Sequence, residues 1–577
     1  MNHELSVSTG QYSDKGRKAI NQDFHGLCIP EAKVLTMKGI AVALADGISS
    51  SDVSQIASET AVKTFLADYY CTSDAWSVKN SMLRVLSAIN GWLHGQTMSS
   101  PLRYDKDKGY VCTLSTLVIK NNCAHIFHVG DSRIYRFNQQ GFEQLTNDHR
   151  VWLNNKEESY LTRAIGIEDD CQFDHRRIEI KVDDIFILST DGVHEFIEPD
   201  EINAIIDRYP DDLNLAAKTI AEQAYDAGSD DNLTIQIVRI DQLPSQLKNK
   251  VKDDISALPF PPSLDVGIAF DGYEIIRKIH TSSRSHVYLA QDKSTQKQVV
   301  IKAPAIDLKN NEHYLELFIM EEWIAARISN GHVGKSFAAS RKRNYLYTVF
   351  EYIEGQTLAQ WQRDNPNSCM DKVRDIISQV AKGLQAFHRM EMLHQDLRPE
   401  NIMIDQHGTI KLIDFGAVSV TGMQETLIDT PATYLLGTAL YSAPEYFLGE
   451  VGDTRSEQFS LAVLCYFLLS GKYPYGTNVA KCKTLAAQRA LAYQTVLSED
   501  KNIPSWVDYA IKKAVHPLPS RRYEELSEFI HDLHKPSITY INQIQPPLIE
   551  RNPVAFWQGV SVSLTLLVIY LLGVING

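Results

Sequence analysis

The N-terminal half of the chain alternates short apolar runs with polar segments rich in turn-forming residues. Runs of apolar and β-branched residues over 40–45, 114–120 and 185–189 predict β-strands packed in a sheet. Between the first two runs, residues suited to a buried face recur at helical spacing at Val53, Ile56, Ala57, Thr60, Ala61, Thr64 and Phe65. This period predicts a helix that lays one face on the sheet, so this half should mix strands and helices.

The C-terminal end of the chain is strongly apolar. Residues 554–575 contain no charged residue, and they exceed the ~20 apolar residues with which a helix spans a bilayer. Trp557 and Tyr570 lie within this stretch and Arg551 precedes it, which favours a cytoplasmic position for the bulk of the chain. The pattern predicts a single-pass transmembrane helix. A buried helix of a soluble core is the alternative, but the length and uniform lack of charge favour the anchor.

Two proline-containing segments divide the chain. One ends at Pro259, Pro261 and Pro262, and the other runs from Pro536 to Pro553. Proline removes backbone donors and favours extended linker structure, so we expect boundaries there. The predicted organisation is a first domain, a linker, a second domain, a juxtamembrane linker and a transmembrane helix, over residues 5–240, 241–268, 269–534, 535–553 and 554–575.

Composition narrows the class of protein. A chain of 577 residues exceeds the size of one domain, so several globular units are expected. Its 57 basic and 71 acidic residues give a formal charge of -14, which argues against a nucleic-acid partner. The eight cysteines are scattered without a C-x-x-C pair, and no secretory signal opens the chain. We therefore expect reduced cysteines and cytoplasmic catalytic domains.

Two apolar runs of the N-terminal half end in the same way, each delivering an aspartate into a glycine turn. These are Ala45-Asp46-Gly47 and Thr190-Asp191-Gly192. A lone Asp-Gly pair is usually only a turn. Carboxylates that converge at the ends of buried strands need a cation, and Mg²⁺ or Mn²⁺ prefers such oxygen ligands.

A longer ordered series surrounds these two turns. It comprises Gly16-Arg17-Lys18-Ala19-Ile20-Asn21-Gln22-Asp23, Ala45-Asp46-Gly47, Thr113-Leu114-Ser115-Thr116, Val129-Gly130-Asp131-Ser132-Arg133, Asp191-Gly192 and Asp230-Asp231-Asn232. The series resembles the metal-dependent PP2C-type serine/threonine phosphatases. The resemblance implies two packed antiparallel sheets flanked by helices. It also implies two metal ions held by Asp23, Asp46, the Gly47 carbonyl, Asp191 and Asp231, with Asp131 bordering a possible third.

Two positions of this first domain depart from the family pattern. At the position of the family's phosphate-binding arginine this chain has Lys18, and Arg17 is adjacent to it, so either residue is a candidate phosphate ligand. Ser49 and its neighbours follow Asp46-Gly47 where some relatives carry a histidine, so a general acid at that point is not expected. The implied chemistry is attack on phosphorus by a metal-activated water, without a phosphoenzyme.

The C-terminal half carries a second ordered set of motifs. These are Val299-Val300-Ile301-Lys302, His394-Gln395-Asp396-Leu397-Arg398-Pro399-Glu400-Asn401, Asp414-Phe415-Gly416 and Ala443-Pro444-Glu445. Their order resembles a eukaryotic-type (bacterial Hanks-type) serine/threonine protein kinase, which implies a bilobal fold.

The resemblance also implies roles for individual residues of this second domain. Lys302 would bind the ATP phosphates and pair with Glu321, with Glu322 as the fallback. Asp396 would orient the substrate hydroxyl. Asn401 and Asp414 would hold Mg²⁺, and Arg398 would make a second contact with phosphate.

Three departures from the kinase pattern leave a second interpretation open. His280, Ser282 and Ser285 stand where three glycines would let backbone amides approach the nucleotide. Gln395 replaces the arginine that pairs with a phosphorylated activation loop, which suggests activity without that switch. Arg398 replaces a lysine. A pseudokinase that binds nucleotide or partners is therefore the alternative to an active kinase.

The sequence as a whole predicts a membrane-anchored, bifunctional α+β multidomain enzyme. It would phosphorylate serine or threonine in proteins with ATP and Mg²⁺, and remove phosphate from such proteins with Mg²⁺ or Mn²⁺. Threonines between the metal loop and Ala443 suggest autophosphorylation, at Thr421, Thr426, Thr430, Thr433 and Thr438. The first domain would then edit the second across the linker.

Overall fold

The computed structural model describes residues 4–138, 141–153, 158–244, 258–282, 284–308, 311–337, 343–424, 439–497, 503–544 and 553–576. The chain divides into two compact units, one of residues 1–255 with 420–429 and the other of residues 256–419 with 430–577. Each unit is described by itself.

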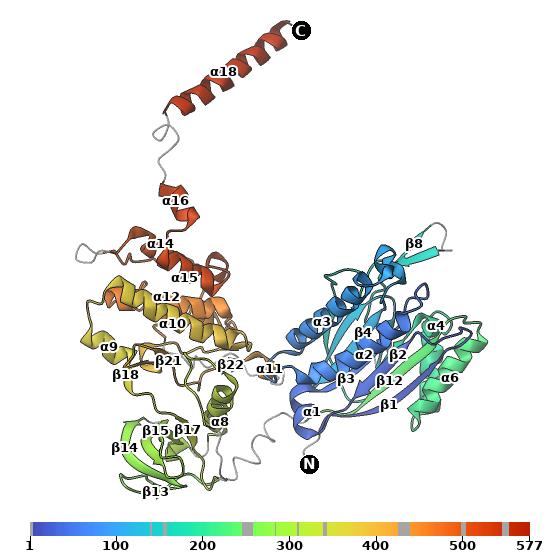
Figure 1. The fold of residues 1–577 in the computed structure, drawn as a ribbon, viewed down its shortest axis with the longest axis horizontal. Helices are drawn as coiled ribbons and strands as arrows, with labels where there is room; N and C mark the ends of the chain where they lie inside the picture. Colours follow the sequence, from blue (N-terminus) through green and yellow to red (C-terminus); the bar gives the residue numbers. More distant parts are fainter. Residues whose placement is uncertain are drawn as a thin grey trace. The chain divides into compact units, whose positions relative to one another are not determined.

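The first unit contains two five-stranded antiparallel sheets (Figure 1). One sheet has the order β1 (Ser6–Asp14), β12 (Leu233–Gln242), β11 (Ile185–Ser189), β6 (Arg133–Asn138) and β7 (Gly141–Gln144). The other has the order β10 (Asp174–Glu179), β5 (Cys123–Val129), β4 (Leu114–Lys120), β3 (Ile40–Ala45) and β2 (Phe24–Cys28). The strands predicted at 40–45, 114–120 and 185–189 are thus confirmed as β3, β4 and β11.

The core of this unit lies between the two sheets and on their outer faces. Ile40, Val42 and Leu44 of β3 pack with Phe186 and Leu188 of the other sheet. The alternate alanines of β3 face the opposite way, into a second apolar cluster with helices α2 and α3. Because both faces of β3 are covered, all six of its residues are buried, which explains its continuous apolar sequence.

Helices flank the sheets, as the sequence predicts. They are α1 (Ala32–Lys38), α2 (Ser54–Cys71), α3 (Val78–Met98), α4 (Asp191–His194), α5 (Pro199–Arg208) and α6 (Leu213–Asp226). Short 3₁₀ turns at Pro101–Tyr104 and Lys106–Lys108 and a hairpin of β8 (Arg150–Leu153) and β9 (Glu158–Leu161) complete the unit. In α2 the predicted face is correct for Ala57, Ala61 and Phe65 but wrong for Ile56, which is 42% exposed while Val62 is fully buried.

The second unit begins with a sheet of five antiparallel strands. These are β13 (Ala269–Phe270), β14 (Tyr273–Thr281), β15 (Ser285–Asp292), β16 (Gln298–Pro304) and β17 (Thr348–Glu351). Helix α8 (Glu312–Arg327) contacts β17. Apolar residues of β14, β15 and β16 form the core cluster of this part, with Tyr347 at its edge.

The rest of the second unit is mainly helical. Its helices are α9 (Leu358–Asp364), α10 (Met370–His388), α12 (Thr454–Ser470), α13 (Leu485–Arg489), α14 (Ser505–Ala514) and α15 (Leu526–His534), whereas α11 (Thr421–Gln424) belongs to the first unit. Its short strands are β18 (Gly355–Thr357), β19 (Met392–Leu393), β20 (Ile402–Asp405), β21 (Ile410–Leu412) and β22 (Ser419–Val420). Its 3₁₀ turns include Ile306–Leu308, Pro399–Asn401, Pro444–Leu448, Val479–Lys481 and Pro519–Arg521. Helices α10 and α12 lie side by side (Figure 1), and the loops that carry the kinase-like motifs flank β20 and β21.

The C-terminal helices are α16 (Ile538–Ile544) and α18 (Pro553–Asn576). Across the described residues, no helix combines the length and hydropathy that a bilayer crossing requires. The predicted transmembrane helix at 554–575 is therefore not supported, although the same residues are helical. A physical reason is that the polar side chains of Gln558, Ser561 and Thr565 interrupt the apolar sequence of α18.

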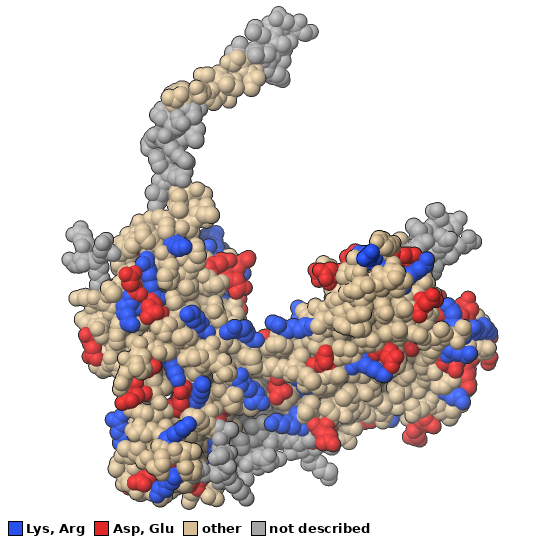
Figure 2. Space-filling view, in the orientation of Figure 1, with Lys and Arg blue, Asp and Glu red and all other residues tan. Residues whose placement is uncertain are grey.

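Surface charge and cysteine state complete the description. On the face drawn in Figure 2, Lys and Arg side chains are interspersed with Asp and Glu side chains. All eight cysteines are free thiols.

Candidate functional sites

A cavity of about 510 Å³ in the first unit gathers most of the predicted metal ligands. Its lining includes Asp46, Gly47, Asp131, Asp191 and Asp231. Each residue comes from the end of a strand or the turn next to one, where the backbone leaves the sheet. The strands of both sheets therefore deliver carboxylates from distant parts of the sequence to one place.

Backbone contacts fix the turn after β3. The Asp46 amide donates to Thr113 Oγ1 at 3.0 Å, and the Thr113 amide donates to the Asp46 carbonyl at 2.7 Å. A Cβ at Gly47 would lie 2.9 Å from the Gln22 carbonyl oxygen and from Ser54, so the turn has no room for a side chain. This close packing holds Asp46 at the cavity wall.

Asp23 lies buried beside this cavity. Its Oδ2 accepts a hydrogen bond from Thr190 Oγ1 at 3.0 Å, and its Oδ1 is buried without a hydrogen-bond partner in the described structure. Burial raises the pKa of Asp23 to about 7, and the neighbouring Asp191 adds to this effect. Burial also raises the pKa of Asp46, and the charges of Asp23, Asp191 and Asp131 raise it further. Such crowding favours a cation among the carboxylates.

The donor set fits a hard divalent cation, because it consists of carboxylates and one carbonyl. In the part of the chain that the structure describes, no three His, Cys, Asp or Glu side chains are arranged as they stand to hold an ion. Two basic side chains instead take up part of the negative charge. Arg150 pairs with Asp131 and Asp191, and Lys18 Nζ lies 3.1 Å from Asp231 Oδ2. The roles of the carboxylates as metal ligands stay predictions.

The structure separates the two candidate phosphate ligands. Arg17 donates to the carbonyls of Ser229 and Tyr225 at 2.6 and 3.0 Å and stacks over the Tyr225 ring. Lys18 faces the carboxylates, with its Nζ also 3.2 Å from Ser49 Oγ. Arg17 is therefore occupied in holding two segments together, and Lys18 is the one of the two that faces the carboxylates.

In the second unit, three predicted residues meet. Lys302 Nζ lies 2.6 Å from Glu321 Oε1 and 3.0 Å from Asp414 Oδ1. Burial opposes the charge on Lys302, but Glu321 and Asp414 outweigh it and raise its pKa, so the ammonium is retained. Burial likewise opposes ionisation of Asp414, yet Lys302 lowers its pKa below the usual range. The backbone of Asp414 lies in the left-handed region, at φ 68°, which is the strained geometry found at functional positions.

The fallback partner of Lys302 is occupied elsewhere. Glu322 Oε2 accepts from Arg343 Nη1 at 2.7 Å, and the second guanidinium nitrogen contacts Oε1. Glu321, by contrast, is only 2% exposed and faces Lys302. Helix α8 thus presents two adjacent glutamates to two different cations.

The catalytic loop is closed by a side-chain amide. Asn401 Nδ2 donates to both the carbonyl and the Oδ2 of Asp396, each at 2.9 Å. Arg398 Nε donates to Glu400 Oε2 at 2.7 Å. Asp396 and Asn401 are therefore adjacent, as their predicted roles require.

The glycine-poor nucleotide loop makes contacts that glycines could not make. Ser282 Oγ accepts from the amides of Arg284 and Ser285 at 3.2 and 3.0 Å and donates to the Ser285 carbonyl at 3.1 Å. Tyr314 of α8 donates its hydroxyl to the Arg284 carbonyl. His280 is exposed. Side-chain hydrogen bonds thus brace this loop where the family relies on glycine flexibility.

A buried glutamate holds the start of the catalytic loop. Glu457 Oε1 accepts from the amide of His394 and from that of Gln395, the latter at 3.0 Å. Its Oε2 lies 2.6 Å from His388 Nε2. Gln395 has a left-handed backbone, with φ 60°, so α12 fixes the loop at a strained position.

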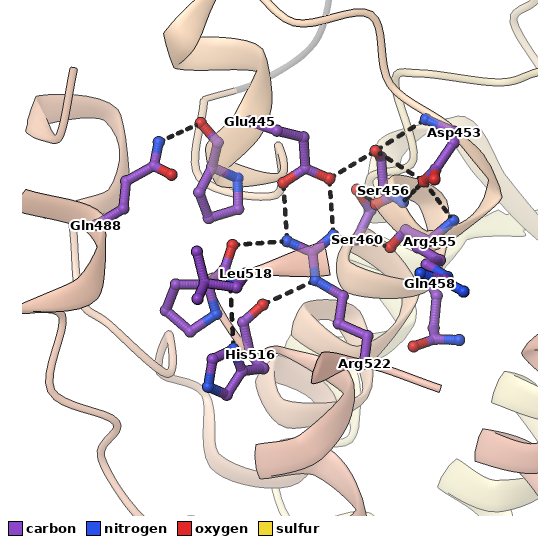
Figure 3. A network of polar contacts seen from close by, with 12 residues as sticks. Glu445, Asp453, Arg455, Ser456, Gln458, Ser460, Gln488, His516, Leu518 and Arg522 are labelled. Atoms are coloured by element: carbon purple, nitrogen blue, oxygen red, sulfur yellow. Dashed lines mark hydrogen bonds and ion pairs between the residues drawn. The ribbon is translucent and has the colours of Figure 1, made fainter. Parts of the chain in front are cut away.

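A polar network fixes the segment after the activation loop (Figure 3). Arg522 and Glu445 form two parallel bonds of 2.7 and 2.8 Å, with side chains 0% and 4% exposed. Arg522 also donates to the carbonyls of His516, Pro517 and Arg455. Ser456 Oγ donates to Glu445 Oε1 at 2.6 Å. The guanidinium therefore joins α12, the loop after α14 and the Pro444–Leu448 turn.

Sequence reasoning missed four residues that the structure places at these sites, namely Arg150, Tyr314, Glu457 and Arg522. None belongs to a motif read from the sequence, and each acts on a partner far away along the chain. An isolated arginine or glutamate carries no spacing signal, so only the folded arrangement reveals it.

Comparison with known proteins agrees with this division. Residues 11–234 match the family model for protein phosphatase 2C, and residues 273–536 match the model for the protein kinase domain. A probable serine/threonine-protein kinase of Clostridium acetobutylicum is 28% identical over 271 residues, which are 47% of this chain and 40% of that protein. The chain therefore spans about two fifths of the length of that relative.

Two solved phosphatase structures resemble part of this chain. A serine/threonine phosphatase of S. agalactiae is 23% identical and covers 41% of this chain and 100% of that chain, with a TM-score of 0.36. The catalytic domain of the phosphatase PstP, solved in complex with two manganese ions, is 20% identical and covers 41% of this chain and 100% of that chain, with a TM-score of 0.34.

Proposed function

Because the chain joins a protein phosphatase 2C domain to a protein kinase domain, we propose that it both transfers phosphate to serine or threonine and removes it. The observation that carries the proposal is the assembly of two separate charged sites. One is the carboxylate cavity of the first unit, and the other is the Lys302, Glu321 and Asp414 cluster of the second.

For phosphate transfer, the residues of the second unit serve to bind and orient. Lys302, kept charged and held by Glu321, is placed for the ATP phosphates. Asp414 and Asn401 would hold Mg²⁺, which neutralises charge on the phosphates when bound. Asp396 is held by Asn401 at 2.9 Å and would orient the substrate hydroxyl and take its proton.

For phosphate removal, the residues of the first unit would hold two divalent cations, Mg²⁺ or Mn²⁺. These are Asp23, Asp46, the Gly47 carbonyl, Asp191 and Asp231. When bound, such ions supply an activated water and offset the charge of the phosphate. Lys18 would bind a phosphate oxygen and fix its orientation. No side chain next to Gly47 offers a general acid, so the leaving oxygen would take its proton from water.

The pseudokinase alternative rests on the glycine-poor loop, and the structure gives a reason to prefer the active kinase. Ser282 and Tyr314 hold the loop through hydrogen bonds, so a defined loop shape does not require glycine. The Lys302 to Glu321 ion pair is formed. Both features are arrangements that ATP-dependent transfer needs.

Paired assays on the purified full chain test the two activities separately. We expect Lys302→Ala to abolish labelling of a serine/threonine substrate by ATP while phosphate release from a phosphopeptide continues. Asp191→Ala should have the opposite effect. Lys293→Ala, which removes an exposed lysine in the turn after β15, is the matched control. A wild-type chain that releases phosphate but transfers none, with its second unit folded, would favour the pseudokinase.

The substrates and regulation follow from the same proposal. The partners would be serine/threonine proteins, and the chain itself is one candidate. Thr421 is described, whereas Thr426, Thr430, Thr433 and Thr438 lie outside the described residues. Phosphate on 421–438 should accumulate in Asp191→Ala compared with the wild type; equal occupancy would contradict self-editing.

Membrane attachment is a separate proposal. Its support is a series of exposed apolar side chains on α18, at Val554, Trp557, Val562, Leu564, Leu566 and Leu567. Attachment through this helix would leave both catalytic units in the reducing cytoplasm. Fractionation of cells that express the full chain or a chain ending at residue 544 tests it. The full chain should resist carbonate extraction, and equal extraction of both chains would refute attachment.

A further inference from the structure

Arg150 occupies an unusual position in the carboxylate cavity. It begins β8 and sends its guanidinium among three acidic side chains. Nη2 lies 2.5 Å from Asp131 Oδ2 and 3.0 Å from Asp191 Oδ2, while Nη1 lies 2.8 Å from Glu195 Oε1. One cation thus bridges a carboxylate from the turn after β5 and two carboxylates from the start and the end of α4.

The surroundings make this bridge strong. Asp131 and Arg150 have side chains only 5% and 17% exposed, so water screens their charges little. Two of the three contacts use the same guanidinium nitrogen, and the planar fork fits neighbouring carboxylates. Without a cation between them, Asp131 and Asp191 would repel each other, because their side chains are only 5% and 18% exposed.

A divalent ion bound between Asp131 and Asp191 would need the oxygens that Arg150 now contacts. An ion and a guanidinium cannot share that place, because like charges a few ångström apart repel. The carboxylates Asp23, Asp46 and Asp231, in contrast, make no contact with Arg150 in the ion pairs described. The cavity is therefore divided into a part open to metal ions and a part filled by a side chain.

We propose that Arg150 is a tethered cation that replaces a third divalent metal ion between Asp131 and Asp191. The inference rests on the proposed phosphatase function and deepens it, since it states how many ions the site takes. Arg150 is a positioning residue here. It holds Asp131 and Oδ2 of Asp191 in place, while the two ions would take the other oxygen of Asp191 together with Asp23, Asp46, the Gly47 carbonyl and Asp231.

Counting bound Mn²⁺ tests the proposal without relying on activity. Isothermal titration calorimetry and electron paramagnetic resonance of free Mn²⁺ would be applied to the full chain without nucleotide. We expect Arg150→Ala to bind one ion more than the wild type. Its affinity for that ion should be at least about tenfold higher than any third-site affinity of the wild type, because the charge-assisted contacts of Arg150 with Asp131 and Asp191 no longer have to be broken.

Three further variants sharpen the result. Arg150→Lys keeps the charge and should bind the extra ion more weakly than Arg150→Ala. Adding Asp131→Asn to Arg150→Ala should remove the extra ion again. Arg163→Ala is the matched control, because Arg163 pairs with Asp174 and does not line the cavity; it should leave the count unchanged.

The outcomes separate the inference from the phosphatase proposal. Equal counts and affinities in the wild type and Arg150→Ala would overturn the inference while leaving a two-metal phosphatase intact. An extra ion that persists with Asp131→Asn would also overturn it. If neither protein bound Mn²⁺, the phosphatase proposal would fail, and the role of Arg150 would fail with it.

Discussion

The buried ion pair of Arg522 and Glu445 gives a prediction whose size follows from the structure. Arg522→Leu keeps most of the side-chain volume but removes the guanidinium. Glu445 would then be left in a site where its side chain is 4% exposed, with Ser456 Oγ as its remaining donor among the described residues. The three carbonyls that Arg522 contacts would also lose a donor.

The expected loss is large for a single substitution. Removing one partner of a buried, hydrogen-bonded pair costs about 3–5 kcal/mol, because the other charge stays buried without compensation. For a unit of this size each kcal/mol corresponds to roughly 2–4 °C in the unfolding temperature. Arg522→Leu should therefore lower the transition of the second unit by roughly 6–20 °C.

Differential scanning calorimetry of the full chain measures this change. The transition of the first unit is the one expected to rise on addition of Mn²⁺, so the other belongs to the second unit. Arg521→Leu is the matched control, because the neighbouring arginine is exposed, and it should shift the transition little. The double variant Arg522→Leu/Glu445→Leu should recover part of the loss, because no unpaired charge remains. Equal shifts in Arg522→Leu and Arg521→Leu would refute the reasoning.

Three further predictions concern the nucleotide loop, the phosphate ligand and acid stability. Tyr314→Phe removes the donor to the Arg284 carbonyl and should raise the KM for ATP roughly twofold to tenfold, the worth of one hydrogen bond; an unchanged KM would show that the brace is dispensable. Lys18→Gln should lower kcat/KM for phosphopeptide hydrolysis roughly tenfold to a hundredfold, whereas Arg17→Gln should act mainly on unfolding stability, and the reverse order would exchange their roles. Burial lowers the pKa of His125 to about 3, so below pH 6.5 the unfolded chain binds a proton that the folded chain does not. The free energy of unfolding should therefore fall by about 1.4 kcal/mol per pH unit as the pH drops from about 6.5 towards 3. Urea unfolding at pH 7 and pH 5 should show a smaller decrease for His125→Gln than for the wild type, and parallel decreases would contradict the assignment.

The spacing of apolar residues and the turn-forming residues between the apolar runs were enough to predict much of the first unit. The strands at 40–45, 114–120 and 185–189 have the predicted bounds, because each is a continuous buried run bordered by turn residues. The face of α2 was predicted less well. Ile56 is exposed although Ser54 and Ala57 on either side of it are buried, so the buried face of the helix is turned away from Ile56. Periodicity identifies the helix, while the neighbouring sheet decides which of its side chains are buried.

Motifs predicted which residues meet, but not how charge is balanced between them. Ordered spacing placed Asp46, Asp131, Asp191 and Asp231 at one cavity, as the structure shows. The choice between Arg17 and Lys18 needed coordinates, because both are basic and adjacent in the sequence. Short-range patterns cannot tell which of two neighbours faces a site when no regular helix or strand fixes their direction.

The two charged sites differ in the cation that each still requires. In the second unit, one lysine faces two carboxylates, so a single negative charge is left over, and the pKa of Lys302 is raised while that of Asp414 is lowered. In the first unit, the described residues set two basic side chains, Lys18 and Arg150, against five carboxylates, and burial together with repulsion raises the pKa of Asp46. The first site should therefore gain more stability from a divalent cation alone than the second, which would bind its ion together with ATP. Because Lys18 and Arg150 lie at the edges of the first site, the positive charge of a divalent cation is needed at its centre, around Asp23 and Asp46.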